Sequence, residues 1–209
     1  MRKNLILLAA GYSKRFHGTK LLAEYRGRPL YQTAIEKLLW LCENRKDSYL
    51  CVVAASPQIY MYCEEKKIPF VRNEGSDNTG IASSIQKAVL FLREEETADG
   101  ESCDVFFTAD MPLLDLCDVN AFLDAYDLSG HTFGTMSCDG IWRSPNIFQA
   151  SARDELLSLS GDCGGKTILK RHAADVFCYE TANREQFFDI DTREDLSALS
   201  DGIISSYFS

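Results

Sequence analysis

The sequence LILLAAGYSKRFHGTKLL, residues 5–22, joins an apolar run to a loop of glycines and cations. The run over residues 5–10 has the length and composition of one buried parallel strand. Gly11 and Gly18 frame the loop that follows, which carries three cations within seven residues: Lys14, Arg15 and Lys20. In open α/β sheets, ligands bind beyond the carboxyl ends of the strands. We therefore expect this loop to lie at a ligand-binding edge of a parallel sheet.

Outside this stretch, strand-like and helix-like segments alternate along the chain. Apolar residues at helical spacing predict helices, and short apolar runs predict strands. The helices are expected over 30–43, 57–66, 81–96 and 115–127, and the strands over 49–55, 68–72 and 104–110. Pro69 restricts its strand to an edge or a strand start. This βαβα order implies a three-layer α/β/α fold with a mostly parallel sheet covered on both faces.

The second half of the chain is less regular. Two segments, 131–137 and 145–149, predict strands with no helix between them, which indicates an antiparallel insertion or edge in a mixed sheet. The remaining expected elements are helices over 151–159, 164–173 and 192–207 and a strand over 175–180. No repeat, low-complexity segment or linker interrupts the sequence, so we expect a single domain over 1–209.

Composition narrows the classes of protein. The 209 residues are 45% hydrophobic and 25% charged, as in an ordinary globular chain, and the formal net charge is −9. That charge argues against general binding to nucleic acid or to anionic membranes. The run over residues 5–10 is too short for a signal peptide, and no segment approaches the roughly 20 apolar residues of a membrane span. We therefore expect a soluble, cytoplasmic protein with no nucleic-acid or membrane partner.

Eight cysteines are many for this length, but they are scattered without a CxxC pair. That spacing gives no support to a zinc ribbon or a thioredoxin motif. We expect reduced thiols that serve as small core residues. Cys163 lies in a glycine-rich segment, yet no neighbouring histidine or base marks it as a nucleophile. For His17, inside the cation-rich loop, a phosphate contact and a solvated position are both open, whereas His131 and His172 are expected at the surface.

The cation-rich loop has the composition of an anion-binding site. Glycines allow backbone N–H groups to approach a ligand, and Lys and Arg side chains add charge and hydrogen-bond donors. Two familiar phosphate motifs are excluded, because a Walker loop requires GxxxxGK[ST] and a dinucleotide fingerprint requires GxGxxG. By itself the loop is compatible with a polyphosphate site and with a solvated turn.

Two acidic segments are predicted at the same edge of the sheet. The strand VFFTAD ends with Asp110, and the segment FDIDT, residues 188–192, alternates acidic and apolar positions before a helix. On a strand end, Asp189 and Asp191 would share a face. Carboxylates from two distant segments can jointly hold a Mg²⁺ ion that bridges phosphates. The plainer alternatives are a turn at Asp110 before Pro112 and a helix cap at Asp191.

Together with the loop, these segments resemble a known family. LAAGYSKRFHGTKLL is similar to the LAAGxSxRMGxxKLL signature of nucleotidyltransferases with a glycosyltransferase-A-type fold, and in particular of the molybdenum cofactor cytidylyltransferases. Further segments resemble that subgroup in the expected order: Asn73, GIASSI at 80–85, TADMP at 108–112, GDCGGK at 161–166 and DIDTREDL at 189–196. The resemblance spans most of the chain and implies a nucleotide-diphospho-sugar transferase-like fold.

The resemblance implies roles for the positions of the first loop. Ala10 and Gly11 would meet the nucleotide through their backbone, and Arg15 and Lys20 would hold its triphosphate as catalytic cations. The residues Ala9-Ala10-Gly11 are similar to the pattern of the family branch that uses CTP. Relatives that transfer a guanylyl group have Ala-Gly-Gly at these positions. CTP is therefore the expected nucleotide.

The resemblance also implies roles for residues of the later segments. Gly80 and Ser84 would border the base of the nucleotide. Asp110 and Asp191 would carry Mg²⁺, and Asp110 would join the two cations of the first loop as a catalytic residue.

The chain departs from the family pattern at two places. The family glycine follows Arg15 by three residues instead of two, although Arg15 and Lys20 keep their spacing of five. Where cytidylyltransferases show GxPGHP, residues 140–145 read GIWRSP, so that Arg-Ser replaces the Gly-His pair. Arg143 and Asp162, in two irregular loops, are our candidate residues for the acceptor. The alternative for Arg143 is an exposed position, next to Trp142, on an antiparallel insertion.

The function implied is a Mg²⁺-dependent transfer of CMP from CTP to molybdopterin, with release of pyrophosphate. A phosphate monoester is already an anionic nucleophile, so positioning and charge neutralisation suffice without a side-chain base. One alternative is an enzyme of the same fold that acts on a sugar or polyol phosphate, or uses GTP. Another is a non-catalytic accessory protein that delivers nucleotide or cofactor to a molybdoenzyme client. We expect Lys20→Ala to impair turnover severely and to weaken triphosphate binding at little cost in stability, because an exposed loop position is expected for Lys20.

Overall fold

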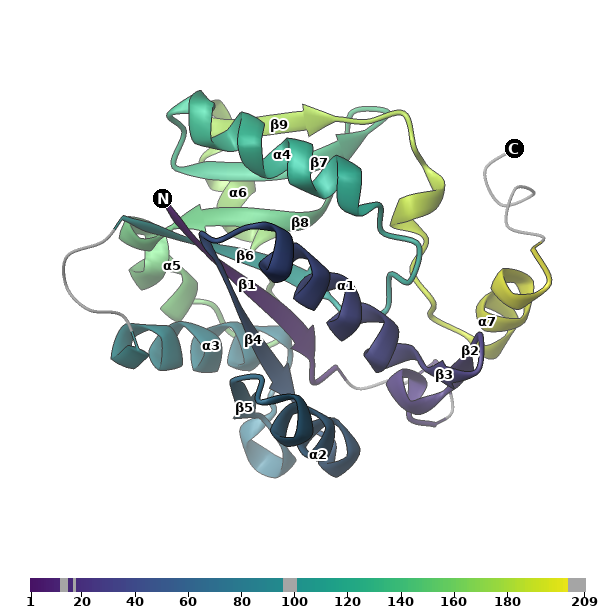
Figure 1. The fold of residues 1–209 in the computed structure, drawn as a ribbon. Coiled ribbons are helices and arrows are strands. Elements are labelled where there is room, and N and C mark those ends of the chain that lie inside the picture. The colour runs from purple at the N-terminus through teal and green to yellow at the C-terminus, as the bar shows by residue number, and fades with distance from the viewer. Residues whose placement is uncertain (12–14, 17, 96–100, 203–209) are drawn as a thin grey trace.

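A computed structural model describes residues 1–11, 15–16, 18–95 and 101–202. Lys14 and His17 of the cation-rich loop, and the end of the expected helix over 192–207, lie outside the described residues. Within them, a seven-stranded sheet in the order β5-β4-β1-β6-β8-β7-β9 lies between two layers of helices (Figure 1).

One half of the sheet is entirely parallel. β1 (Arg2–Ala9) lies between β4 (Ser48–Ala54) and β6 (Ser102–Thr108), and β5 (Phe70–Arg72) pairs with the far side of β4. The carboxyl ends of these strands therefore meet at one edge of the sheet. β5, which directly follows Pro69, is the last strand on its side, as the sequence predicts.

The other half contains the antiparallel strand of a mixed sheet. β8 (Ile141–Gln149) is antiparallel both to β6 and to β7 (Phe133–Cys138), and β9 (Val176–Glu180) is parallel to β7. The antiparallel insertion is confirmed, and it lies inside the sheet. In the β7–β8 ladder, Thr135 pairs with Asn146 and Met136 pairs with Arg143, so the register shifts between them. This irregularity lies toward the carboxyl end of β6, because Asn146 also pairs with Phe106.

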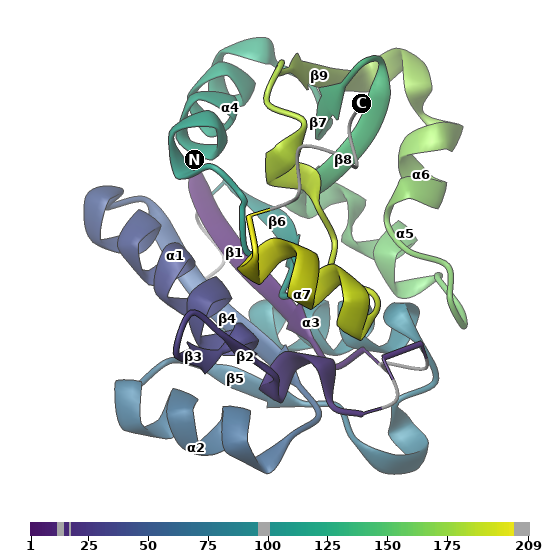
Figure 2. The same cartoon turned by 90° about the vertical axis from the view of Figure 1, so that its right-hand side faces the viewer.

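Helices cover both faces of the sheet, which confirms the three-layer α/β/α fold (Figures 1 and 2). One face carries α1 (Leu30–Asn44), α2 (Pro57–Lys66) and α4 (Leu116–Ser129), and the other carries α3 (Ile81–Glu95), α5 (Arg153–Leu157) and α6 (Lys166–Arg171). The last helix, α7 (Arg193–Ser200), is shorter than predicted. Among the described residues, no helix is long and apolar enough to cross a membrane.

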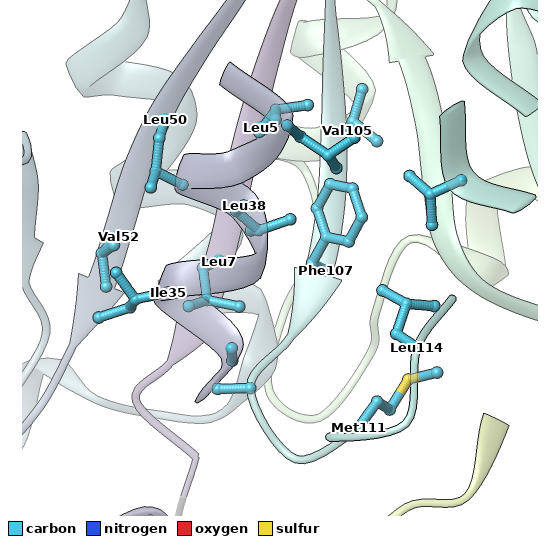
Figure 3. Packing of buried hydrophobic residues seen from close by; sticks show 14 of the residues in the cluster. Leu5, Leu7, Ile35, Leu38, Leu50, Val52, Val105, Phe107, Met111 and Leu114 are labelled. Atoms are coloured by element: carbon cyan, nitrogen blue, oxygen red, sulfur yellow. The ribbon is translucent and has the colours of Figure 1, made fainter. Parts of the chain in front are cut away.

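Alternate side chains of β1 enter the two helical layers. Leu5 and Leu7 lie against α1, where Ile35 and Leu38 meet them (Figure 3). Ile6 belongs to the core on the α3 side. None of these five side chains is more than 2% exposed. Burial of each contributes about 1.5–3 kcal/mol, which explains why the strand is a continuous apolar run.

A smaller hydrophobic cluster joins segments from the start and the end of the chain. We call it the N–C cluster; its buried members are Phe16, Tyr25, Leu30, Phe188, Ile190 and Leu199. It includes a short hairpin of β2 (Glu24–Tyr25) and β3 (Arg28–Pro29), which the sequence analysis does not predict, and α7 lies next to that hairpin (Figure 2). Ile190 N donates to Asp110 O at 3.1 Å, which ties the acidic segment near the chain's end to the end of β6.

The cysteines are only partly core residues. Four of them are buried, namely Cys51, Cys63, Cys103 and Cys138, and all eight are free. Burial raises the pKa of Cys51 and of Cys103 to about 12. For Cys117, Cys163 and Cys178, which are exposed, the expectation of a core position is wrong.

Candidate functional site

A cleft of about 470 Å³ lies at the carboxyl ends of β1 and β6. Pockets for small molecules usually have a volume of this order. The residues predicted to bind nucleotide or metal all line it: Ala10, Gly11, Arg15, Lys20, Gly80, Ser84, Asp110 and Asp191. These positions come from four separate segments. The parallel sheet brings three of them to one edge, because the carboxyl ends of its strands meet there, and the hydrogen bond from Ile190 N to Asp110 O brings Asp191 to the same place.

Two cations and two aspartates form a connected group in this cleft. Lys20 Nζ lies 2.7 Å from Asp110 Oδ2 and 3.6 Å from Asp191 Oδ1. Arg15 Nη2 lies 3.0 Å from Asp191 Oδ2. Both carboxylates thus contact one ammonium group, so they lie close together at the same end of the sheet. The Lys20 side chain is only 12% exposed, so the expectation of an exposed loop position is wrong.

Asp110 has an oxygen that suits a metal ligand. Its Oδ1 atom is buried and has no hydrogen-bond partner among the described residues. In the part of the chain that the structure describes, no group of three or more His, Cys, Asp or Glu side chains is arranged to hold an ion. The protein therefore offers two carboxylates, those of Asp110 and Asp191. This is the kind of site in which Mg²⁺ takes its remaining ligands from phosphate and water.

The acidic segment before α7 differs from the expectation. It is not a strand, so its two aspartates do not share a strand face; Asp191 lines the cleft and Asp189 lines a neighbouring pocket. Thr192 and Asp195 form the capping box of α7, so Asp191 is not the helix cap. Burial and the carboxylates of Asp110 and Asp191 raise the pKa of Asp189 to about 6. Asp189 remains in contact with solvent, which moderates this effect.

Buried amides shape the part of the cleft before α3. Asn78 Nδ2 donates to Ala10 O at 2.6 Å, and this contact fixes the backbone at the end of β1. The amide of Asn73 and the hydroxyl of Ser84 are hydrogen-bonded at 2.9 Å. All four residues are buried. The sequence resemblance includes Asn73 but not Asn78, whose role depends on a contact 68 residues away in the chain.

Gly80 allows a second loop to reach this part of the cleft. Ala82 N donates to Gly161 O at 3.1 Å. Gly80 has φ +126°, and a Cβ atom there would lie 2.5 Å from Gly161 O and 2.6 Å from Asp162 Oδ1. Asp162, a candidate acceptor residue, thus lies in the larger cleft beside a predicted base-binding position. It is not placed with Arg143.

A smaller pocket of about 130 Å³ adjoins the cleft and shares Thr108 and Asp110 with it. Arg143, Lys166 and Asp189 also line it. Arg143 is therefore next to the candidate metal ligand. Lys166 is a cation that our sequence analysis did not single out, although it ends the GDCGGK segment that resembles the family.

The two cations of the smaller pocket are held in place. Arg143 Nε is buried and has no hydrogen-bond partner among the described residues, and its guanidinium carbon lies 6.0 Å from the centre of the Phe187 ring. Lys166 Nζ donates to Trp142 O at 2.8 Å. Burial and the neighbouring Arg143 lower the pKa of Lys166. Trp142 and Arg143 lie on the antiparallel strand β8, as the alternative expects, but both are half-buried and not fully exposed.

Solved structures with the same fold bind nucleotides and a metal. Rv0371c from Mycobacterium tuberculosis H37Rv has a TM-score of 0.75 at 16% identity, covering 96% of this chain and 98% of that chain. The same protein has also been solved in complex with manganese. CMP:2-keto-3-deoxy-manno-octonic acid synthetase in complex with CTP has a TM-score of 0.73 at 12% identity, covering 99% and 100%.

A third similar structure is named for the biosynthesis of molybdopterin-guanine dinucleotide. Molybdopterin-guanine dinucleotide biosynthesis protein A from Archaeoglobus fulgidus has a TM-score of 0.64 at 17% identity, covering 97% of this chain and 99% of that chain. A comparison with curated proteins finds no match. The structural likenesses establish a nucleotide-diphospho-sugar transferase-like fold. Residues 5–176, most of the chain, match the family described as MobA-like NTP transferase domain. The chain therefore belongs to the MobA-like NTP transferase family.

Proposed function

We propose that the protein is a Mg²⁺-dependent nucleotidyltransferase that transfers CMP from CTP to the phosphate of molybdopterin and releases pyrophosphate. The observation that carries this proposal is the contact of Lys20 with both Asp110 and Asp191, next to a cationic pocket that shares Asp110. Family membership supports nucleotidyl transfer. The choice of CTP and molybdopterin rests on the resemblance to the cytidylyltransferases.

The cations of the larger cleft suit a triphosphate. The Arg15 side chain is 74% exposed, so its guanidinium is free to leave Asp191 and grip phosphate oxygens bidentately. The Lys20 ammonium group already contacts the carboxylates of Asp110 and Asp191. Phosphate oxygens bound there would become additional partners of this ammonium group. Two positive charges at the cleft would stabilise the charge that develops as pyrophosphate leaves.

Asp110 and Asp191 are the residues that would hold the metal. The unpartnered Oδ1 atom of Asp110 supports this assignment, and the manganese complex of Rv0371c supports a divalent cation in a protein of this fold. When bound, Mg²⁺ would neutralise phosphate charge and act as a Lewis acid.

The smaller pocket suits the phosphate of the acceptor. Arg143 and Lys166 offer two cations there, and Thr108 and Asp110 form the boundary with the larger cleft. An acceptor phosphate oxygen in this pocket would attack the α-phosphorus of CTP. The new P–O bond forms as the bond between the α-phosphorus and the bridging oxygen breaks, and pyrophosphate leaves with the electron pair. The attacking oxygen is already anionic, so this step needs no proton transfer.

A pyrophosphate-release assay tests the proposal. Purified protein is incubated with Mg²⁺, molybdopterin and each of the four ribonucleoside triphosphates in turn. We expect release with CTP and loss of that release in Lys20→Ala. Lys87→Ala is the matched control, because Lys87 lines neither pocket and pairs with the exposed Asp77.

Each alternative has its own outcome in this assay. Release with a sugar or polyol phosphate in place of molybdopterin would favour a different acceptor, and release with GTP a different nucleotide. No release with any pair would favour a non-catalytic accessory protein. Normal turnover in a folded Lys20→Ala variant would contradict the assignment of Lys20.

A further inference from the structure

Asp162 is a carboxylate in the larger cleft that the proposed chemistry does not use. It lines the cleft together with Gly80, Ile81 and Ser84. The two cations of the cleft contact other carboxylates, those of Asp110 and Asp191. Asp162 therefore lies where the nucleotide is expected to bind, but it is not one of the residues that would contact the phosphates of the nucleotide.

The position of Asp162 is fixed by its contacts with the start of α3. Gly161 O accepts from Ala82 N at 3.1 Å, and Asp162 Oδ1 comes within 2.6 Å of the place that a Cβ atom of Gly80 would take. The backbone that carries Asp162 is thus held against the start of α3, while the carboxylate itself is exposed to the cleft.

The remainder of the loop is held just as closely. A Cβ atom at Gly164 would lie 3.4 Å from Ile81 Cδ1, and one at Gly165 would lie 2.7 Å from the ring of Phe148, which is fully buried. Cys163 N donates to Ser160 O at 3.1 Å. The backbone of the loop is thus anchored on both sides of Asp162, which reduces the ordering that a ligand would have to impose on it.

The part of the cleft that contains Asp162 suits a nucleobase. If the triphosphate lies against Arg15 and Lys20, the base of the nucleotide extends toward the other residues that line the larger cleft. Among these, Ile81 offers an apolar side chain that is 36% exposed, against which a base ring can pack. Asp162 follows on the same wall, next to Gly80. The base is thereby offered one apolar surface and one anionic hydrogen-bond acceptor.

We propose that Asp162 selects the base by accepting a hydrogen bond from the exocyclic amino group of cytosine, and that it rejects uracil. Aspartate is a natural partner for the cytosine N4 amino group. Uracil carries an oxygen at the same position, so two acceptors would face each other with no proton between them. This inference rests on the proposed function, which it deepens. Because Asp162 is exposed, we expect discrimination on the order of 100-fold, below that of fully buried polar sites.

The test is the Asp162→Asn variant. Its amide presents either an oxygen to cytosine or an NH₂ group to uracil, so the ratio of kcat/KM for CTP to that for UTP should fall by at least roughly 10-fold. Equilibrium binding of CMP and UMP, measured by calorimetry, gives the same comparison without acceptor or turnover. Cys163→Ser is the matched control, because Cys163 is an exposed residue of the same loop. Its ratio should equal that of the wild type.

Several results would overturn the inference. They are an unchanged ratio in Asp162→Asn, an equal loss for both nucleotides, and a wild-type preference for UMP over CMP. Failure of the proposed function would give different results in the binding and pyrophosphate-release measurements. A wild-type protein that prefers CMP but releases no pyrophosphate with molybdopterin contradicts the proposed acceptor and leaves the binding comparison intact. A preference for GMP over CMP contradicts both CTP as the nucleotide and the assignment of Asp162 to the amino group of cytosine.

Discussion

Replacing Gly80 by alanine should destabilise the protein and displace the loop that carries Asp162. The new Cβ atom would lie 2.5 Å from Gly161 O and 2.7 Å from Gly161 C, which are backbone atoms without rotamers to change. Overpacking of this kind costs about 1–3 kcal/mol. A φ of +126° adds about 1–3 kcal/mol of backbone strain for an L-residue. We therefore expect the free energy of unfolding to fall by about 4 kcal/mol.

Thermal unfolding followed by circular dichroism measures this effect. In a domain of this size about 4 kcal/mol lowers Tm by roughly 10 °C. Gly27→Ala is the matched control: Gly27 has φ +80° with no atom within 4 Å of the new Cβ, so it isolates the backbone term of about 1 kcal/mol, or roughly 3 °C. The KM for CTP should rise in Gly80→Ala and stay unchanged in the control. Equal melting temperatures for the two variants would refute the close contact between Gly80 and Gly161.

Three further predictions concern the metal site, the acceptor pocket and the core. Asp110→Asn should lower metal-dependent turnover by about 100- to 1000-fold, measured as pyrophosphate release across a Mg²⁺ titration; unchanged turnover would exclude Asp110 as a metal ligand. Arg143→Ala should raise the KM for the acceptor and leave the KM for CTP unchanged in steady-state kinetics, whereas an effect on CTP alone would remove Arg143 from the acceptor site. Arg153→Met removes contacts of 2.8 and 2.7 Å to the buried Asp104, so urea denaturation should show a loss of about 3–5 kcal/mol with unaltered kinetic constants; a smaller loss would mean that water reaches Asp104.

Elements with a strong local pattern were predictable from the sequence. The alternation of Leu5, Ile6 and Leu7 between two cores requires a strand that is apolar at every position, and that run is visible without the structure. The helix after Ser56 was predicted with its observed bounds, because proline at a first helical position is a local signal. Asp110 was expected on the strand and follows it instead, although the backbone pairing continues as far as Ala109 N, which donates to Leu8 O.

Features that depend on distant partners were not predictable. The hairpin of β7 and β8 is a local feature, but the insertion of β8 beside β6 depends on a register between Phe106 and Asn146. The enclosure of Lys20 depends on two aspartates that follow it by 90 and 171 residues. Asp162 was assigned to the acceptor because its loop comes late in the chain, whereas its location follows from a contact with Gly80.

The N–C cluster also sets the moment during synthesis at which the cleft becomes complete. Asp191 is translated roughly 80 residues after Asp110, which at about 5–20 residues per second corresponds to roughly 4–16 s. During that interval a nascent chain possesses β1 and β6 and the cations between them, but it lacks the second carboxylate and the apolar partners of Phe16. The hydrogen bond from Ile190 N to Asp110 O can form only after residue 190 has left the ribosome. Translation thus delays the meeting of the two carboxylates until the parallel half of the sheet, β5-β4-β1-β6, has been synthesised.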